Sequence, residues 1–519
     1  MAGAFAYCIV SSVIGVLLFG GGIGLIPLFH KIVHDMVVEQ LVIDKSSMTY
    51  DGWVSPGATI YMQFWFFDLV NPTEVMSGHL PYFAERGPYT YREHREKQNI
   101  TWNNNGTVSY RNKMTYIFDP SMSVGTEDDV FTTINIPLLT ITTFLEYSPN
   151  IVKWLADLFS RIVGEDLFIE RSVKELLWGY EDPIFSFIHT FTGDTFLPSG
   201  DFGLFMDKNN SDDGVYTVYT GEHDIDKLNS IENWNGRPNV TWWTTDEANM
   251  INGTDGTMNR PFADLSEKPY LFSSDICRSI FGEYEKDVHY EGIRLVRFTG
   301  PSYIFANGTE YPPNAGFCTP DIDHCLPGGL LNVSVCKQGA PVVFSLPHFL
   351  YADPRVLLPT MSPNKEEHET FVDADPITGI TMRVAKRLQT NIHLKPSKYA
   401  RRTSGVQEMF FPVMWLNESC ELDDASVHKY KESVQTPIQI MDIAPYIIAG
   451  IGFIIIIVTL ILAVRRYRKK RTSRSLESCT ERTSLLHEEE FKERGNGEPR
   501  PNRWFCHITR KLEFHESKL

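Results

Sequence analysis

IAPYIIAGIGFIIIIVTLILAV, residues 443–464, carries no charged side chain and is followed at once by the basic run RRYRKKR, residues 465–471. An apolar helix of about 20 residues is long enough to cross the hydrocarbon core of a bilayer. Basic residues beside such a helix are retained on the cytosolic side of the membrane. The sequence therefore predicts a transmembrane helix over residues 443–464 and a cytosolic tail over residues 465–519.

A second uncharged stretch, FAYCIVSSVIGVLLFGGGIGLIPLF, covers residues 5–29. The alternative to a retained span is a cleaved signal peptide, but no basic region precedes it, it exceeds the usual apolar length, and its glycine-rich end is a poor match to a cleavage site. We expect a retained helix. Two spans then place residues 1–4 in the cytosol with the tail, and residues 30–442 on the opposite side.

The large loop between the spans contains every Asn-x-Ser/Thr sequence of the chain, which is the acceptor pattern for N-glycosylation. These asparagines are Asn99, Asn105, Asn209, Asn239, Asn252, Asn307, Asn332 and Asn417. Their confinement to one side predicts a lumenal or extracellular glycosylated domain.

The tail carries 15 Lys and Arg against 9 Asp and Glu, so the net charge of −17 divides into +6 there and −23 elsewhere. So acidic a domain argues against nucleic acid as a partner.

Cysteine usage fits an oxidising compartment. Five cysteines lie in the loop, at Cys277, Cys318, Cys325, Cys336 and Cys420. They predict two disulfides and one free thiol, with the pairing left open. Cys8, in the first span, is a candidate for palmitoylation, and an unmodified thiol is the alternative.

The loop has mostly β character, with alternating or aromatic-rich runs at 59–70, 214–221 and 293–300. These runs predict a large, mostly antiparallel β domain with long decorated loops. No internal repeat or low-complexity linker divides it.

Two helices interrupt this β pattern at about residues 149–179. In the first, Ser148 is a cap, Pro149 suits the first helical position, and the apolar residues follow helical spacing. Those apolar residues are Ile151, Trp154, Leu155, Leu158, Phe159 and Ile162. In the second, Ser172 and Glu175 have capping-box spacing and Gly179 ends the helix. The apolar faces either cover the end of the β domain or bind a protein partner.

No motif of a known catalytic or metal site occurs: H-E-x-x-H, G-x-S-x-G, a P-loop and C-x-x-C are all missing from the sequence. We therefore predict no catalytic residue, metal ligand or cofactor. His324 and His368 lie near sulfur or carboxylates, and we interpret both as surface histidines.

Gly20 and Gly24 form a G-x-x-x-G pattern that would let the two spans associate, although such matches are frequent by chance.

The cytosolic tail contains ERTSLL, in which an acidic residue, Glu481, precedes the pair Leu485 and Leu486. Dileucine sorting signals have this spacing because a carboxylate contacts a basic patch of a clathrin adaptor while the leucines enter a pocket. The alternative is a chance leucine pair. We expect a working signal in a flexible segment.

The chain resembles the class B scavenger receptors, also called the fatty acid translocase family, over nearly its whole length. The strings that carry the resemblance are QFWFFDLVNP (63–72), ERGPYTYRE (85–93), NIPLLT (135–140), ELLWGYEDPIF (175–185), WNG (234–236), SDICRS (274–279), NAGFC (314–318), PHFLYADP (347–354) and HETFVDADPITGI (368–380). WWTTDEANMINGTDG (242–256) and LLNVSVCKQGAP (330–341) look most like the family's lysosomal member.

The resemblance implies an α+β membrane protein with a β-barrel-like ectodomain anchored at both ends, an apical helical bundle and a hydrophobic tunnel. It implies disulfides Cys277–Cys336 and Cys318–Cys325, with Cys420 unpaired. The implied ligands are cholesterol, phospholipid or fatty acid, and a lumenal hydrolase resembling glucocerebrosidase. A plasma-membrane receptor for lipoproteins, fatty acids or microbial ligands is the alternative to an endosomal or lysosomal one. Oligomeric state is left open, a homo-oligomer included.

Two departures from the family pattern bear on function. Gly164, Glu165 and Asp166 stand where lipoprotein-binding members carry lysines, which puts a cationic patch at that place in doubt. Asn150 stands where the lysosomal member has a histidine. Asparagine does not titrate near pH 6, so acid release of a partner would rely on other groups.

Overall fold

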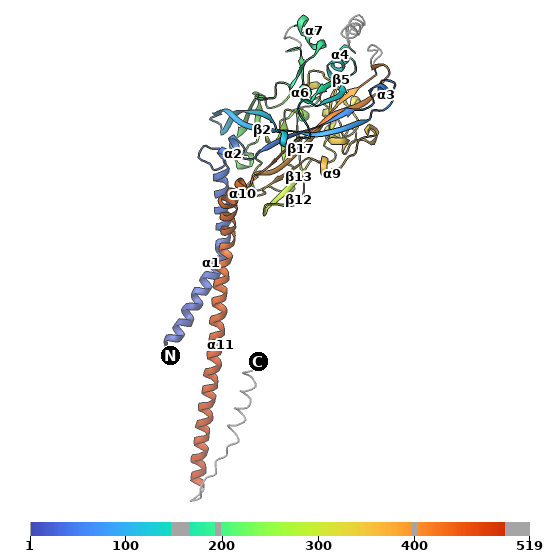
Figure 1. Ribbon diagram of the computed structural model, residues 1–519. Helices are drawn as coiled ribbons and strands as arrows, with labels where there is room; N and C mark the ends of the chain where they lie inside the picture. The colour runs from blue at the N-terminus through green and yellow to red at the C-terminus, as the bar shows by residue number, and fades with distance from the viewer. Residues whose placement is uncertain (1, 147–165, 193–198, 397–402, 494–519) are drawn as a thin grey trace. The chain divides into compact units, whose positions relative to one another are not determined.

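The computed structural model describes residues 2–146, 166–192, 199–396 and 403–493 (Figure 1). The chain divides into two compact units, residues 35–433 and residues 1–34 with 434–519. We call the first the β domain and the second the membrane-helix unit. The predicted partner-binding residues, from Ile151 to Ile162, lie outside the described residues.

A twelve-stranded antiparallel sheet forms the centre of the β domain. Its main path runs through β12 (Glu283–Tyr290), β13 (Ile293–Thr299), β16 (Phe371–Ala374), β17 (Thr381–Leu394), β18 (Met409–Glu421), β1 (Ile60–Leu69), β2 (Phe83–Trp102), β3 (Thr107–Phe118), β8 (Val215–Tyr219) and β9 (Ile231–Trp234). Off this path, β15 (Val342–Ser345) pairs with β17 and with β14 (Leu331–Asn332). Within the described residues the hydrogen-bonded path does not return from β9 to β12, so no closed barrel is detected there.

Alternation along β1 gives the sheet two different faces. Phe64 and Phe66 are buried, whereas Gln63 and Trp65 are partly exposed. In the antiparallel register Phe64 pairs with Leu416 of β18, and Trp65 pairs with Trp415. We call the side of Phe64 the inner face and the side of Trp65 the outer face. Successive side chains of a strand point to opposite faces, so the aromatic-rich segment 59–70 supplies both.

Three two-stranded sheets and several short helices surround this centre among the residues that the structure describes. The small sheets are β4 (Val130–Ile134) with β5 (Phe168–Ser172), β6 (Tyr180–Glu181) with β7 (Asp201–Phe202), and β10 (Tyr270–Ser273) with β11 (Arg278–Phe281). In the described part of the β domain the α-helices that follow α1 are α2 (Tyr50–Val54), α3 (Pro72–Met76), α4 (Ile136–Glu146), α6 (Val173–Trp178), α7 (Pro183–Thr192), α8 (Asp246–Asn249), α9 (Lys365–His368) and α10 (Asp424–Tyr430).

Helix α6 confirms the predicted capping box. The Ser172 hydroxyl accepts from the Glu175 N–H, and the Glu175 carboxylate accepts from the Ser172 N–H at 2.8 Å. Gly179 ends the helix with a φ of 118°, a region that disfavours residues with a Cβ. Helix α7 was not predicted, although its start is also visible in the sequence. There Asp182 accepts two backbone N–H bonds ahead of Pro183.

The membrane-helix unit contains most of α1 (Ala2–Leu41) and all of α11 (Thr436–Glu493). Both are long and apolar enough to cross a membrane, which fits a two-pass membrane protein. Helix α1 continues twelve residues past the predicted end at residue 29. Helix α11 has Pro445 inside it and starts before residue 443.

Glycines bring these two helices together, but they are not the predicted pair. A Cβ added at Gly22 would lie 2.5 Å from the backbone nitrogen of Ala449, and one added at Gly15 would lie 3.0 Å from Ile455. At Gly20 and Gly24 an added Cβ would meet no atom within 4 Å. The pattern at Gly20 and Gly24 is therefore a chance match, and these glycines lie on another side of the helix.

Helix α11 also includes the dileucine segment, residues 481–486. We expected a flexible segment there, and the structure has a helical backbone instead. No glycine or proline occurs between Gly452 and Gly495, and Arg, Lys, Glu and Leu favour helix.

Candidate functional site

A cavity of about 500 Å³ opens on the outer face of the sheet. Trp65 of β1 and Trp415 of β18 form one wall, with their rings parallel and their centroids 3.9 Å apart. The remaining lining residues are Glu85, His348, Ser362, Asn364, Glu366, Glu367, His368, Arg387 and Asn417. An aromatic wall beside converging polar groups is the usual composition of a ligand pocket.

A carboxylate and an imidazole are paired inside this outer-face cavity. His348 Nε2 lies 2.9 Å from Glu85 Oε2, and Trp415 Nε1 donates to Glu85 Oε1 at 2.7 Å. Burial alone would raise the pKa of Glu85, but the bonds from His348 and Trp415 hold it below its usual range. His348 has a φ of 52°, which is uncommon for a residue with a side chain. Its N–H donates to Gln389 Oε1 at 2.7 Å, which helps to hold that conformation.

His368 is buried against His348, so our interpretation of His368 as a surface residue is wrong. The rings stack with centroids 4.5 Å apart, and His368 exposes 3% of its surface. Burial, reinforced by His348, lowers the pKa of His368 to about 4. His324 is the surface histidine that we expected, more than half exposed beside Asp321. The error at His368 arose because the loop that folds this histidine onto the sheet is invisible to local patterns.

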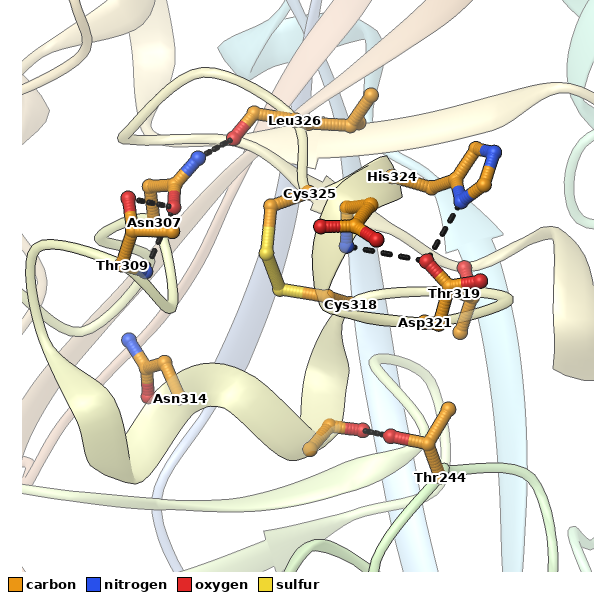
Figure 2. Close-up of a disulfide and its surroundings, with 12 residues drawn as sticks. Thr244, Asn307, Thr309, Asn314, Cys318, Thr319, Asp321, His324, Cys325 and Leu326 are labelled. Carbon is orange, nitrogen blue, oxygen red and sulfur yellow. Dashed lines mark hydrogen bonds and ion pairs between the residues drawn. A yellow bond between two sulfur atoms is a disulfide. The ribbon is translucent and has the colours of Figure 1, made fainter.

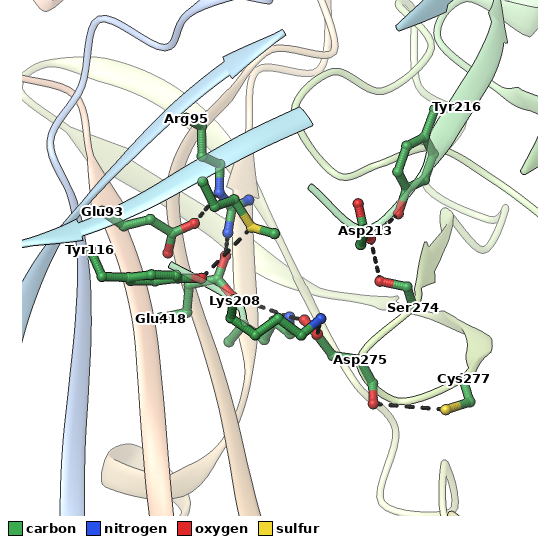
Figure 3. Close-up of polar contacts among 12 residues, drawn as sticks. Glu93, Arg95, Tyr116, Lys208, Asp213, Tyr216, Ser274, Asp275, Cys277 and Glu418 are labelled. Atoms are coloured by element: carbon green, nitrogen blue, oxygen red, sulfur yellow. Dashed lines mark hydrogen bonds and ion pairs between the residues drawn. The ribbon is translucent and has the colours of Figure 1, made fainter. Parts of the chain in front are cut away.

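A cluster of charged side chains occupies the inner face of the same sheet (Figure 3). Arg95 of β2 bonds to Glu93 and to Glu418 of β18. Lys386 of β17 continues the network, with Nζ 3.1 Å from Glu418 and 3.5 Å from a carboxylate oxygen of Asp275. We call this set, with Lys208 and Lys337, the inner charged cluster.

The inner charged cluster changes from dry to solvent-accessible along its length. At one end the Glu93 side chain has no exposed surface, and burial raises its pKa. At the other end Asp275 exposes 49% of its side chain and Lys208 exposes 33%. Burial would raise the pKa of Asp275, but Lys386, Lys208 and Lys337 together hold it well below its usual range.

Basic groups outnumber acidic ones in the inner charged cluster. Four basic side chains face three carboxylates, one of them Glu93 with its raised pKa. Burial lowers the pKa of Lys337, although the Asp275 charge acts against that shift. The accessible end of the cluster is therefore suited to an anionic group.

Two disulfides cross-link the lobe beside β10 and β11, by which we mean residues 277–336. Cys277 bonds to Cys336, and Cys318 bonds to Cys325, which are the pairs that the resemblance implies. The second closes a short loop in which His324 Nδ1 lies 2.6 Å from Asp321 Oδ1 (Figure 2). Cys420 is free, and burial raises the pKa of its thiol to about 11, so it is a poor nucleophile.

Residues 13–463 match the model of the CD36 family. This chain belongs to the CD36 family. It is 40% identical to lysosome membrane protein 2 of Rattus norvegicus over 428 residues, which are 82% of this chain and 87% of that protein. With the Homo sapiens protein of that name it shares 40% over 429 residues, again 82% and 87% of the two chains. It is 36% identical to scavenger receptor class B member 1 of Sus scrofa over 459 residues, 88% of this chain and 89% of that one.

Membership in the CD36 family favours a receptor or transporter over an enzyme and suggests association with lipid and membrane. All eight sequon asparagines belong to the β domain. Four are exposed, at Asn99, Asn105, Asn209 and Asn239, and four are half-buried, at Asn252, Asn307, Asn332 and Asn417. Their glycosylation, palmitoylation of Cys8 and the sorting role of Glu481, Leu485 and Leu486 stay predictions.

Proposed function

We propose that this protein is a glycoprotein of the endosomal and lysosomal membrane that binds lipid on the inner face of its β domain and receives a lumenal hydrolase. Relatives named lysosome membrane protein 2 support the compartment, and the two apolar helices support the anchoring. The inner charged cluster is the observation that carries the lipid part. Its excess of basic groups is accessible at Lys208 and Lys386.

The inner face offers a lipid two kinds of surface. Phe64 and Leu416, buried against the protein, make the inner face apolar beside this cluster, and an acyl chain or a sterol would pack where that face is accessible. Lys208, Lys337 and Lys386 would attract a carboxylate or phosphate headgroup. The ligands that fit are fatty acid and anionic phospholipid, while cholesterol would depend on the apolar surface alone.

The lipid role is tested by equilibrium binding of a fluorescent fatty acid to the full-length protein in nanodiscs. We expect Lys208→Met with Lys337→Met to weaken binding about tenfold, because two basic groups are lost while an unbranched side chain of similar length is kept. Lys227→Met is the matched control, since Lys227 is exposed beside Asp224 and outside the inner charged cluster. Equal affinity of all three proteins would refute the headgroup assignment.

Hydrolase capture rests on the predicted helix at residues 149–164, whose structure is not described. We expect Trp154→Ala or Phe159→Asp to abolish recovery of a lumenal hydrolase in a pull-down of the full-length glycoprotein at neutral pH. Glycan maturation and secretion from the endoplasmic reticulum report correct folding of each variant. Unchanged recovery would assign Trp154 and Phe159 to packing within the protein.

The second candidate is a plasma-membrane scavenger receptor, which the relatives named scavenger receptor class B member 1 support. The cytosolic tail discriminates between an endosomal or lysosomal protein and a plasma-membrane receptor. We expect Leu485→Ala with Leu486→Ala to move the protein to the cell surface, because adaptor binding would be lost. If the double variant has the same steady-state distribution as the unaltered protein, these leucines do not sort it.

A further inference from the structure

Within the described part of the chain, Arg278 of β11 is a buried cation that forms no ion pair. Its relative exposure is 4%, and its guanidinium carbon lies 3.4 Å from the centroid of the Phe317 ring. Over the residues that the structure describes, its hydrogen bonding consists of Nε donating to the Ser279 carbonyl at 3.1 Å. Arg297 shows the usual alternative, with two bonds to the Asp373 carboxylate at 2.6 and 2.7 Å.

Such a group is unfavourable unless something compensates its charge. Removing an ion from water costs several kcal/mol after relaxation, and buried charges are normally paired. The Phe317 ring provides part of the compensation through a cation–π contact. Burial still lowers the pKa of Arg278 to about 9. The remaining donor capacity of the guanidinium therefore needs an acceptor, and a negatively charged acceptor suits it best.

Arg278 lines a small cavity, which offers room for such an acceptor. The cavity holds about 20 Å³ and is bordered by Phe317, Thr319, Asn332 and the Cys318–Cys325 disulfide. This volume is enough for one water-sized particle. Sulfate and phosphate do not fit wholly inside this volume, which favours a monatomic anion or a water molecule.

A second donor borders the same cavity. Asn332 Nδ2 donates to Thr319 Oγ1 at 3.0 Å, so that oxygen acts as an acceptor and the hydroxyl hydrogen stays available to another partner. A cation and a hydroxyl donor together favour an anion over water, because water does not neutralise the charge.

We propose that Arg278 and Thr319 bind one chloride ion in this cavity. The ion joins β11 to the loop of the Cys318–Cys325 disulfide, so the stability of this lobe depends on the halide concentration. The site is separate from the outer-face cavity and from the inner charged cluster, and it does not depend on the lipid or hydrolase role.

The test is thermal unfolding of the full-length glycosylated protein in detergent, in chloride and in gluconate at equal ionic strength. Gluconate is too large for the cavity, so we expect Tm to fall by a few degrees, and chloride or bromide to restore it saturably. Arg278→Met should remove this dependence. Arg294→Met, which loses only an exposed pair with Asp287, should retain it.

An independent measurement covers the case in which Arg278→Met does not fold. Crystals of the unaltered protein grown in bromide should give an anomalous peak within contact distance of the Arg278 guanidinium. Equal Tm in chloride and gluconate, or a cavity without an anomalous peak, would overturn the proposal and assign the space to water.

Discussion

The imidazole rings of His348 and His368 stack with their centroids 4.5 Å apart, and each ring accepts a backbone N–H at Nδ1. The donors are Ser362 at 3.2 Å and Asn364 at 3.0 Å. An Nδ1 that accepts a hydrogen bond carries no proton. In this arrangement the two rings together hold the loop at residues 362–364 against the sheet.

The folded protein should lose stability as pH falls from about 6.5 to about 4. In the folded protein the pKa of His368 is about 4, against an ordinary value of 6.5. Burial and His348 lower this pKa most, Arg387 lowers it further, and Glu85 raises it. Within that window the unfolded chain binds a proton that the folded chain does not, so the contribution is complete above pH 6.5 and is lost as pH falls. The loss is on the order of 3 kcal/mol.

Denaturant unfolding of the full-length protein at neutral and acidic pH measures this effect. His368→Gln should reduce the pH dependence, because its amide oxygen accepts the same N–H without titrating. His324→Gln, at the exposed histidine, should leave it unchanged. A His368→Gln protein with the pH dependence of the unaltered one would contradict the assignment.

Trp415 should contribute to stability through its indole N–H as well as through its ring. Trp415→Phe keeps an aromatic ring beside Trp65 but removes the donor to Glu85 Oε1. We expect a loss of about 1 to 3 kcal/mol in the free energy of unfolding, because Glu85 is left with less compensation. Trp65→Phe, which leaves that bond intact, should cost less. Equal losses would show that the bond to Glu85 does not matter.

The two disulfides should differ in the stability that they confer. Cys277 and Cys336 are 59 residues apart in sequence, and Cys318 and Cys325 are 7 apart. Restriction of the unfolded chain predicts about 4 kcal/mol for the long loop and about 2.5 kcal/mol for the short one. Unfolding of the two double Cys→Ala variants checks the order, and a larger loss at the short loop would exclude this mechanism.

A large side chain at Gly22 should separate the two helices of the membrane-helix unit, whereas a large side chain at Gly20 should not. Phe19 and Phe453 have ring centroids 5.8 Å apart, so cysteines placed there, with Cys8 replaced, should cross-link on oxidation. Gly22→Leu should reduce the yield, because a side chain there meets the backbone of Ala449. Gly20→Leu is the control. Equal yields in both variants would contradict the glycine contact.

Local sequence features predicted the elements that local interactions determine. The strands at residues 59–70, 214–221 and 293–300 and the capping box of α6 have signals within a few residues of one another. The family resemblance added the disulfide pairing, which spacing left open. These features require no knowledge of which strands become neighbours.

The candidate sites depend on contacts between distant segments. Glu85, His348 and His368 come from three parts of the chain, and Trp65 meets Trp415 only because β1 and β18 are neighbours in the sheet. The inner charged cluster has the same origin, since Arg95 lies in β2 and Glu418 in β18, two strands that are far apart in the sequence. Such pairs become visible when the register is known.

Photo-crosslinking with a bifunctional fatty acid in cells, followed by mass spectrometry of the full-length protein, tests the central claim most directly. If the inner face binds lipid, labelled peptides should come from β2, β17 and β18, and the label should fall when Lys208 and Lys337 are both replaced by Met. Label confined to the two membrane helices, unchanged in that double variant, would contradict a lipid site in the β domain.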